Sequence, residues 1–245
     1  RTLDPIFYTS VDSVVQIACH EEHFGLKKLY DLCEESAKVF HPMMVGRIIA
    51  RPFIGNDKDS FYRTNNRKDY TIPPPNPTVC ELLTRNGGAC HAIGKISDIF
   101  AKKGISTSVS GMSDDMLFDE MLKVIKFSQD GDLIFANFVE FDSLYGHRRD
   151  VSGYANAIEE FDKRLPEILN LTGDNDLLLI TADHGCDPTW KGTDHTREHV
   201  PALFFSKKTS SKNLGFLSTF ADMGATISNH LKTPALKKGV VCNLW

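Results

Sequence analysis

The stretch LLLITADHG, residues 177–185, decides the fold of this chain. Its apolar part, residues 177–182, has the length of a strand that is covered on both faces in a parallel sheet. The carboxyl end of such a strand delivers Asp183 and His184 to the rim, where open α/β sheets bind their ligands. Gly185 lets the backbone turn away at once. We therefore predict an α/β fold with functional side chains at this edge.

A second apolar run, residues 132–139, ends in the same way. Asp142 and His147 follow it, and the tract GTDHTRE, residues 192–198, adds His195. Mixed carboxylate and imidazole ligands suit Mn, Zn or Fe, and two clusters indicate a two-metal site that clamps the oxygens of a transferring phosphoryl group. Any one of these residues could equally be a solvated loop residue. Their joint position at strand ends favours metal ligands: Asp142, His147, Asp183, His184 and His195.

The remaining pattern alternates between strands and helices, which is typical of a parallel sheet flanked by helices. Between residues 151 and 171, apolar side chains recur at helical spacing and form one stripe that we expect to face the sheet. The expected helices are 78–86, 114–127, 151–171 and 217–231, and the expected strands are 89–93, 133–139, 177–182 and 202–205.

The proline-rich stretch at residues 69–77 cannot continue a helix or a central strand, and it predicts a linker. We place a small α+β cap domain at residues 1–73 and the metal-binding core at residues 74–245. Within the cap we expect helices at 10–22 and 25–38 and a strand at 44–51.

Composition excludes several classes of function. The net charge of −4 gives no nucleic-acid footprint, and no run approaches the roughly 20 apolar residues of a membrane span. The six cysteines show no CxxC spacing, and no secretory segment precedes them, so we expect a reducing cytoplasm. Cys186 adjoins the predicted ligands and is interpreted as a packed bystander.

Two long stretches, residues 137–150 and 181–206, resemble the signatures of the phosphopentomutase family, within the alkaline phosphatase superfamily. Residues 8–18, 45–53 and 94–100 match as well, so the resemblance covers nearly the whole chain. The cofactor-independent phosphoglycerate mutases share the Asp-His-Gly motif and remain an alternative. The tracts GTDHTRE and YTSVDSV favour the pentomutases.

The resemblance implies an alkaline-phosphatase-like core with two metals. Asp142, His147 and His195 match the ligands of one metal, and Asp183 and His184 match two ligands of the other. The family supplies the last ligand and a phosphorylated Thr from its N-terminal part. We therefore expect the nucleophile upstream of Arg1, and this chain to be a C-terminal part that is inactive alone. The implied cofactors are two Mn²⁺, with Zn²⁺ or another divalent ion possible, and glucose 1,6-bisphosphate as activator.

The implied reaction interconverts ribose 1-phosphate, or 2-deoxyribose 1-phosphate, with the 5-phosphate, an isomerase step of nucleoside catabolism. A pentose phosphate needs cations for its phosphate and a carboxylate for its hydroxyls. By resemblance Asp12 accepts a sugar hydroxyl, Arg47 and Lys95 contact phosphate, and Arg63 and Arg67 are further candidates. Arg51 and Asp69 could instead fix the cap's own fold. A metal-dependent phosphatase, a phosphoglycerate mutase relative and an inactive fragment stay open as alternatives. No nucleic-acid or membrane partner is expected.

Overall fold

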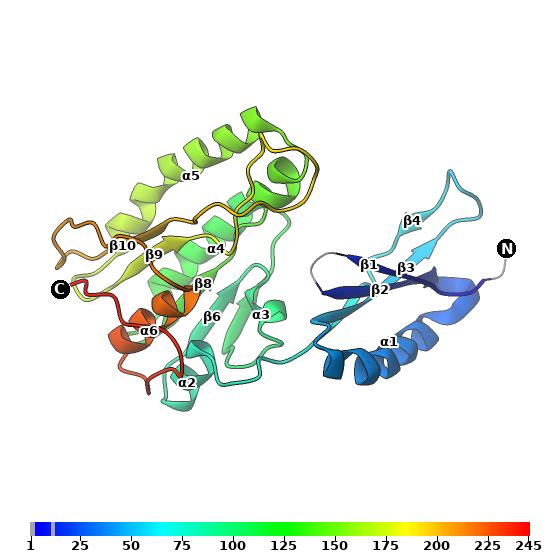
Figure 1. The fold of residues 1–245 in the computed structure, drawn as a ribbon, viewed down its shortest axis with the longest axis horizontal. Helices are drawn as coiled ribbons and strands as arrows, with labels where there is room; N and C mark the ends of the chain where they lie inside the picture. The colour runs from blue at the N-terminus through cyan, green and yellow to red at the C-terminus, as the bar shows by residue number, and fades with distance from the viewer. Residues whose placement is uncertain (1–2, 11–12) are drawn as a thin grey trace. The chain divides into compact units, whose positions relative to one another are not determined.

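The computed structural model describes residues 3–10 and 13–245, with the side chain of Ser10 excepted (Figure 1). The chain divides into two compact units. The first comprises residues 1–75 together with 98–101, and the second comprises residues 76–97 and 102–245. Within the described residues, no helix is both long enough and apolar enough to cross a membrane.

The first unit is a five-stranded sheet with one long helix. The strands run in the order β1-β2-β3-β4, and β5 also pairs with β3; only the β2–β3 pair is parallel. The elements are β1 (Ile6–Ser10), β2 (Val14–His20), η1 (Glu21–Gly25), α1 (Leu26–Phe40), η2 (His41–Met43), β3 (Arg47–Ile54), β4 (Tyr62–Arg63) and β5 (Lys68–Thr71).

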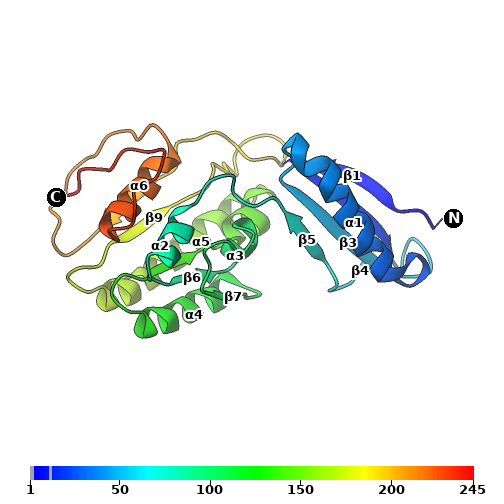
Figure 2. The same ribbon diagram turned by 90° about the horizontal axis from the view of Figure 1, so that it is seen from below.

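Helix α1 lies along one face of this sheet (Figure 1 and Figure 2). Its side chains Leu29, Cys33 and Ala37 recur every four residues and are buried, so they form one apolar stripe. The stripe packs on alternate residues of the two central strands, among them Ile17 and Ile48. This packing forms the core of the first unit.

The sequence-based expectation of a helix over residues 10–22 is wrong where the structure describes this segment, because residue 10 ends β1, residues 14–20 form β2 and helical structure begins only with η1 at Glu21. β2 contains the β-branched residues Val14, Val15 and Ile17, and their stiff side chains pack well on a pleated surface. Apolar residues at 14, 15, 17 and 18 recur at helical spacing, whereas Val15, Ile17 and Cys19 alternate as in a strand, so the spacing alone does not distinguish the two. The helix expected at 25–38 is confirmed as α1, and the strand expected at 44–51 is confirmed as β3, shifted by three residues.

The second unit contains a three-stranded parallel sheet in the order β7-β6-β8 and a separate antiparallel pair, β9–β10. Its elements are α2 (Val79–Arg85), β6 (Cys90–Ile93), β7 (Thr107–Val109), α4 (Asp114–Phe127), β8 (Leu133–Ala136), η3 (Phe141–Gly146), α5 (Val151–Leu171), β9 (Leu178–Thr181), β10 (Ala202–Phe205) and α6 (Phe220–His230). The short helix α3 (Ile96–Ile99) begins in the second unit, and its last two residues are grouped with the first.

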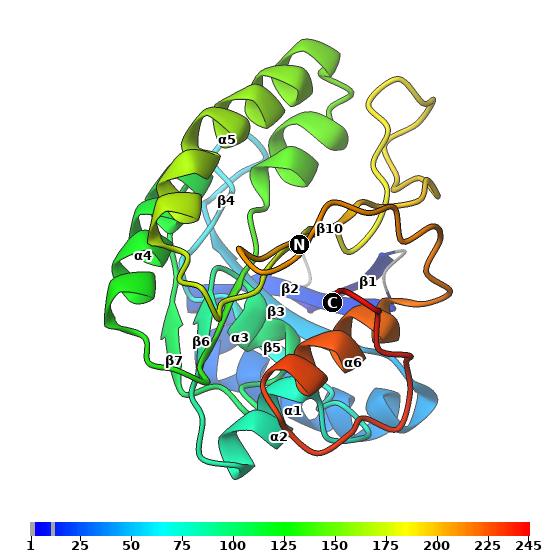
Figure 3. The ribbon, with the colours of Figure 1, turned by 90° about the vertical axis from the view of Figure 1, so that its left-hand side faces the viewer.

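Side-chain alternation gives the parallel sheet two covered faces. On one face, Ile93 of β6 and Ile134 of β8 pack with residues of α4 and α5. On the other, Cys90 and Leu133 pack with α2. Figure 3 shows α4 and α5 side by side, apart from α2 and α6. The predicted α/β architecture, with helices flanking a parallel sheet, is confirmed.

The strand expected at residues 177–182 forms as β9, but it does not extend the parallel sheet. It pairs antiparallel with β10, and its apolar residues are half-buried rather than covered on both faces. A parallel return needs a crossover, usually a helix. No helix forms between the two strands, because residues 182–201 are an irregular loop rich in Gly, Asp and Thr. The chain therefore returns antiparallel.

Candidate metal centre

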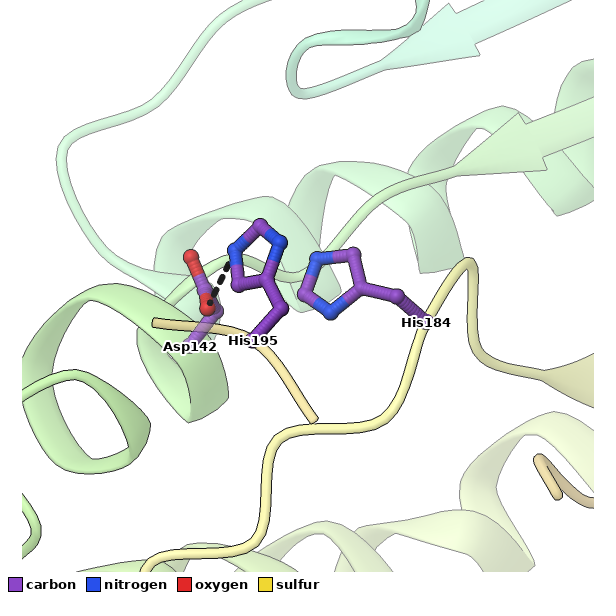
Figure 4. A group of neighbouring side chains, drawn as sticks. All are labelled: Asp142, His184 and His195. Atoms are coloured by element: carbon purple, nitrogen blue, oxygen red, sulfur yellow. Dashed lines mark ion pairs between the residues drawn. The ribbon is translucent and has the colours of Figure 1, made fainter. Parts of the chain in front are cut away.

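Three imidazole rings stack beside one carboxylate in the second unit. Oδ1 of Asp142 lies 3.3 Å from Nε2 of His147 and 3.4 Å from Nε2 of His195. The His195 ring stacks on that of His184, with centroids 3.6 Å apart, and on that of His147, with centroids 4.9 Å apart. Ligand atoms of Asp142, His184 and His195 all lie within 4.8 Å of one another (Figure 4). Four of the five predicted ligands thus lie together.

Asp142 lies in the first turn of the short helical segment η3, which follows β8, and His147 is the C-cap of that segment. The start of this segment is held by Asp114, the first residue of α4. Its Oδ1 accepts from the backbone N–H of Val139 at 2.8 Å, and its Oδ2 accepts from that of Glu140 at 2.9 Å. Burial raises the pKa of Asp114, while these two hydrogen bonds oppose the rise. Asp114 therefore fixes where the Asp142 turn leaves the sheet.

His184 and His195 lie on the long loop between β9 and β10. This loop is closed at its base by a backbone bridge, in which the N–H of Thr196 donates to the carbonyl of Gly185 at 3.1 Å. A Cβ at residue 185 would lie 2.3 Å from Oε2 of Glu198 and 2.8 Å from its backbone nitrogen. Only glycine permits this approach, which brings His195 back toward His184.

Asp183, the fifth predicted ligand, does not belong to the compact group of ligand atoms from Asp142, His184 and His195. Its side chain is 73% exposed, and Oδ1 lies 3.7 Å from Nε2 of His184. The compact group of Asp142, His184 and His195 also cuts across the division implied by the resemblance, which gave His184 and His195 to different metals. One carboxylate among several imidazoles is nonetheless a donor set that suits Zn, Mn or Fe better than Ca or Mg.

Cys186 is buried beside the cluster, and its thiol donates to Oδ1 of Asp142 at 3.5 Å. Burial, and secondarily the negative charge of Asp142, raise the pKa of Cys186. A thiol whose pKa is raised stays protonated at neutral pH, whereas a metal ligand must be a thiolate. In this structure the Cys186 thiol is a hydrogen-bond donor to Asp142.

The first unit contains a basic pocket of about 350 Å³, which we call the arginine pocket. Arg51 donates through Nε to Oε1 of Gln16 at 2.9 Å, and Arg67 forms a two-pronged pair with Asp69. Burial, followed by the charges of Arg67 and Arg63, lowers the pKa of Arg51. Positively charged side chains that lie this close together favour the binding of an anion. The lining residues are Arg51, Pro52, Arg63, Thr64, Asn65 and Arg67.

The other predicted substrate contacts are placed as follows. Asp12 lies outside the described residues. Arg47 lies in β3 with NH1 3.9 Å from Oδ2 of Asp69, the carboxylate that also binds Arg67. Lys95 is exposed and follows Gly94 at the carboxyl end of β6 in the second unit. Arg63 lines the arginine pocket. Arg47 shares the carboxylate of Asp69 with Arg67, another residue of that pocket.

Asp114 and Arg51 were not among the residues predicted for the site. Asp114 was seen only as the start of a helix, and its partners are backbone N–H groups that leave no pattern in the sequence. Arg51 was interpreted as a residue that could simply fix the cap. A signal for it did exist, because it lies four residues after Arg47 in a strand and therefore on the same face.

Comparison with known proteins defines the class. The Metalloenzyme superfamily model matches residues 64–235, and the chain belongs to this superfamily. It is similar over nearly its whole length to proteins named phosphopentomutase. The relative from Psychromonas ingrahamii is 53% identical over 239 residues, which is 98% of this chain. The relative from Aeromonas salmonicida is 52% identical over 235 residues, or 96% of this chain. The resemblance seen in the motifs is confirmed.

The chain spans only 58% of the length of each of these two relatives. Among solved structures, that of the PH0037 protein from Pyrococcus horikoshii is similar with a TM-score of 0.46 and 13% identity, over 74% of this chain and 52% of that one.

Proposed function

We propose that this chain is the metal-binding part of a phosphopentomutase, which interconverts ribose 1-phosphate or 2-deoxyribose 1-phosphate with the corresponding 5-phosphate. The observation that carries the proposal is the 53% identity to such an enzyme over 98% of the chain. That span takes in both loops that bring Asp142, His147, His184 and His195 together. As a working location we propose the cytoplasm, in keeping with six cysteines that are all free.

The residues of the cluster are suited to hold two divalent ions. The proposed ions are Mn²⁺, with Zn²⁺ as the alternative; Asp142, His147 and His195 would bind one, and Asp183 and His184 the other. Ions bound at these positions would neutralise charge on the oxygens of a phosphoryl group in transfer and would help to orient the attacking oxygen.

The hydrogen bonds around two of the imidazoles support roles for His147 and His184 as metal ligands. Nδ1 of His147 contacts the carbonyl of Thr193, and Nδ1 of His184 lies 3.0 Å from the carbonyl of Gly185. A ring whose Nδ1–H donates to a carbonyl presents an unprotonated Nε2, which is the form that binds a metal. In both residues it is Nε2 that lies nearest an aspartate.

For the substrate, we propose that the arginine pocket serves the phosphate. Guanidinium groups match phosphate oxygens in a two-pronged geometry, and the side chain of Arg63, which lines the pocket, makes no ion pair or hydrogen bond with another described residue. Arg47 and Lys95 are proposed as further phosphate contacts and Asp12 as the acceptor of a sugar hydroxyl. Glucose 1,6-bisphosphate would prime the enzyme by donating the group carried on a threonine.

That threonine, and the last ligand of the second ion, are proposed to come from a polypeptide segment beyond the residues of this chain. The relatives are longer than this chain, and the second unit has open strand edges. In the described structure β8 pairs only with β6, and β9 pairs only with β10. Leu203 of β10 is 60% exposed. A further strand would satisfy these backbone groups and cover apolar surface.

The test is conversion of ribose 1-phosphate to ribose 5-phosphate with Mn²⁺ and glucose 1,6-bisphosphate. Two proteins are compared: this chain alone, and this chain preceded by the corresponding N-terminal segment of the Psychromonas ingrahamii relative. Activity only in the extended protein supports the proposal. Activity in this chain alone would place the nucleophile within it. If neither protein converts the sugar phosphate although both bind metal, a panel of phosphoglycerates and simple phosphate esters tests the phosphoglycerate mutase and phosphatase alternatives.

A further inference from the structure

Arg149 connects the two ligand-bearing loops of the second unit. It lies between His147 and the N-cap of α5, Asp150, and its side chain is half-buried. Its backbone has φ 55°, in the left-handed region that residues other than glycine rarely adopt. A costly backbone conformation persists only where surrounding interactions hold it in place.

The guanidinium of Arg149 donates to four backbone carbonyls. NH1 donates to Gly146 at 2.9 Å and to Asp187 at 3.1 Å. Nε donates to Gly192 at 2.6 Å, and NH2 donates to Asp194 at 2.6 Å. Three of these carbonyls belong to residues 187–194, which we call the ligand loop because His195 follows it directly. All three nitrogens of one planar fork are therefore engaged, in hydrogen bonds strengthened by the positive charge.

The ligand loop has few other attachments. Within the described structure, its remaining hydrogen bonds to the rest of the unit are that of the Thr193 carbonyl with His147 and that of the Asp187 N–H with Oγ1 of Thr196. The side chains of this loop bury little surface, and Trp190 is 57% exposed. A loop with so little packing keeps its shape mainly through the polar contacts at its ends and centre. Most of these contacts end on Arg149.

We propose that Arg149 is a positioning residue, which fixes the ligand loop against the turn that carries Asp142 and His147, and so sets Nε2 of His195 beside Oδ1 of Asp142. The inference rests on the proposed metal site for its functional meaning. Arg149 itself binds neither metal nor substrate. It acts by donating hydrogen bonds to several backbone carbonyls at once, which requires the several N–H groups of a guanidinium. A lysine carries a single nitrogen on a flexible side chain and cannot replace all of these hydrogen bonds.

The test uses the whole chain with Arg149→Ala and Arg149→Lys, and with Arg148→Ala as the matched control. Arg148 is the exposed neighbour and carries the same charge. Two properties are measured: the affinity for Mn²⁺ and for Zn²⁺ by calorimetry, and the rate at which a lysine-specific endoprotease cleaves after Lys191, which is exposed within the ligand loop. The free energy of unfolding of each metal-free variant is measured in urea.

We expect Arg149→Ala to weaken metal binding about 10- to 100-fold, as loss of a residue that orients metal ligands typically does. Arg149→Lys should fall between Arg149→Ala and the unchanged chain, and Arg148→Ala should bind as the unchanged chain does. Cleavage after Lys191 should accelerate in the same order. Millimolar guanidinium ion should restore part of the metal affinity of Arg149→Ala and none elsewhere. A purely structural role would lower the free energy of unfolding and leave the affinity of the folded molecules, and their response to guanidinium, unchanged.

Unchanged metal affinity in folded Arg149→Ala overturns the proposal. If Arg149→Ala does not fold, Arg149→Lys decides, and full affinity in that variant has the same meaning. If the unchanged chain binds neither Mn²⁺ nor Zn²⁺, the proposed metal site is wrong. The cleavage rate then decides separately whether Arg149 holds the loop: faster cleavage supports that role, and an unchanged rate overturns it.

Discussion

Oδ1 of Asp142 lies 3.4 Å from Nε2 of His195, although the two residues follow different strands in different sheets of the second unit. Asp142 is placed by the short segment after β8, and His195 by the irregular loop after β9. Neither the segment after β8 nor the loop after β9 belongs to a sheet that would force these two side chains together. The approach depends on the tight closure at Gly185 and on hydrogen bonds to backbone carbonyls.

This contact predicts that His195→Ala abolishes metal binding at the Asp142 site. Removing one imidazole from a set of a carboxylate and two or three imidazoles leaves too few protein ligands for tight binding. Calorimetry with Mn²⁺ and metal analysis of the purified chain measure the effect. His199→Ala is the matched control, because His199 contacts Phe216 instead and should leave binding unchanged. A His195→Ala chain that retains its full metal content and affinity would show that the ligand assignment is wrong.

Asp114→Ala should lower both the stability of the second unit and its metal affinity. The substitution leaves the N–H groups of Val139 and Glu140 without their acceptors, which costs about 1–3 kcal/mol for each buried group left unsatisfied. Urea unfolding and calorimetry measure the two effects. Asp115→Ala is the control: its side chain is 85% exposed and pairs with Arg164, so its loss should cost under about 1 kcal/mol. Equal effects of the two substitutions would contradict the anchoring role.

The sequence predicted the α/β architecture because its signals were local and unambiguous. The apolar stripe of residues 151–171 became α5 with the predicted bounds, and the strand ends after β8 and β9 carry the predicted ligand candidates. Four of those five candidates lie together in the structure. The paired arrangement of β9 and β10 was not predicted, because strand pairing depends on how the chain returns, and residues 182–201 contain no periodic signal.

Two kinds of feature escaped sequence analysis for physical reasons. β2, which lies within the helix expected at residues 10–22, was not predicted as a strand, because its apolar residues suit both periods and the choice depends on pairing with β1 and β3. The roles of Asp114 and Arg149 escaped because their partners are backbone N–H and carbonyl groups, which every residue carries. Such contacts become visible only when the backbone path is known.

The arginine pocket predicts that Arg63→Gln weakens the binding of ribose 5-phosphate at least about tenfold, since a hydrogen bond to a charged group contributes about 1.5–3 kcal/mol. Calorimetry on the whole chain measures the affinity. The effect should shrink as salt is added, because the interaction is partly exposed and screened. Arg85→Gln provides the control, as Arg85 pairs with Glu81 on α2. If both variants bind the sugar phosphate as the unchanged chain does, the pocket is not the phosphate site.

The buried thiols of the first unit predict a loss of stability in alkali. Burial raises the pKa of Cys19 to about 11 and that of Cys33 to about 12. An unfolded thiol has a pKa of about 8.5, so between that pH and about 11 the unfolded chain loses protons that the folded chain keeps. The free energy of unfolding should therefore fall as pH rises through this window, by up to about 1.4 kcal/mol per pH unit for each thiol.

Urea unfolding at pH 8, 9.5 and 10.5 measures this fall, with the first unit followed by the fluorescence of its tyrosines. Cys33→Ala removes one titrating group and should make the slope shallower, although the smaller side chain lowers stability at every pH. Cys242→Ala is the control, because Cys242 is only half-buried and lies in the other unit. The same steep slope in Cys33→Ala as in the unchanged chain would mean that other groups, such as the half-buried Tyr70 phenol, whose pKa desolvation raises to about 12, control the alkaline transition.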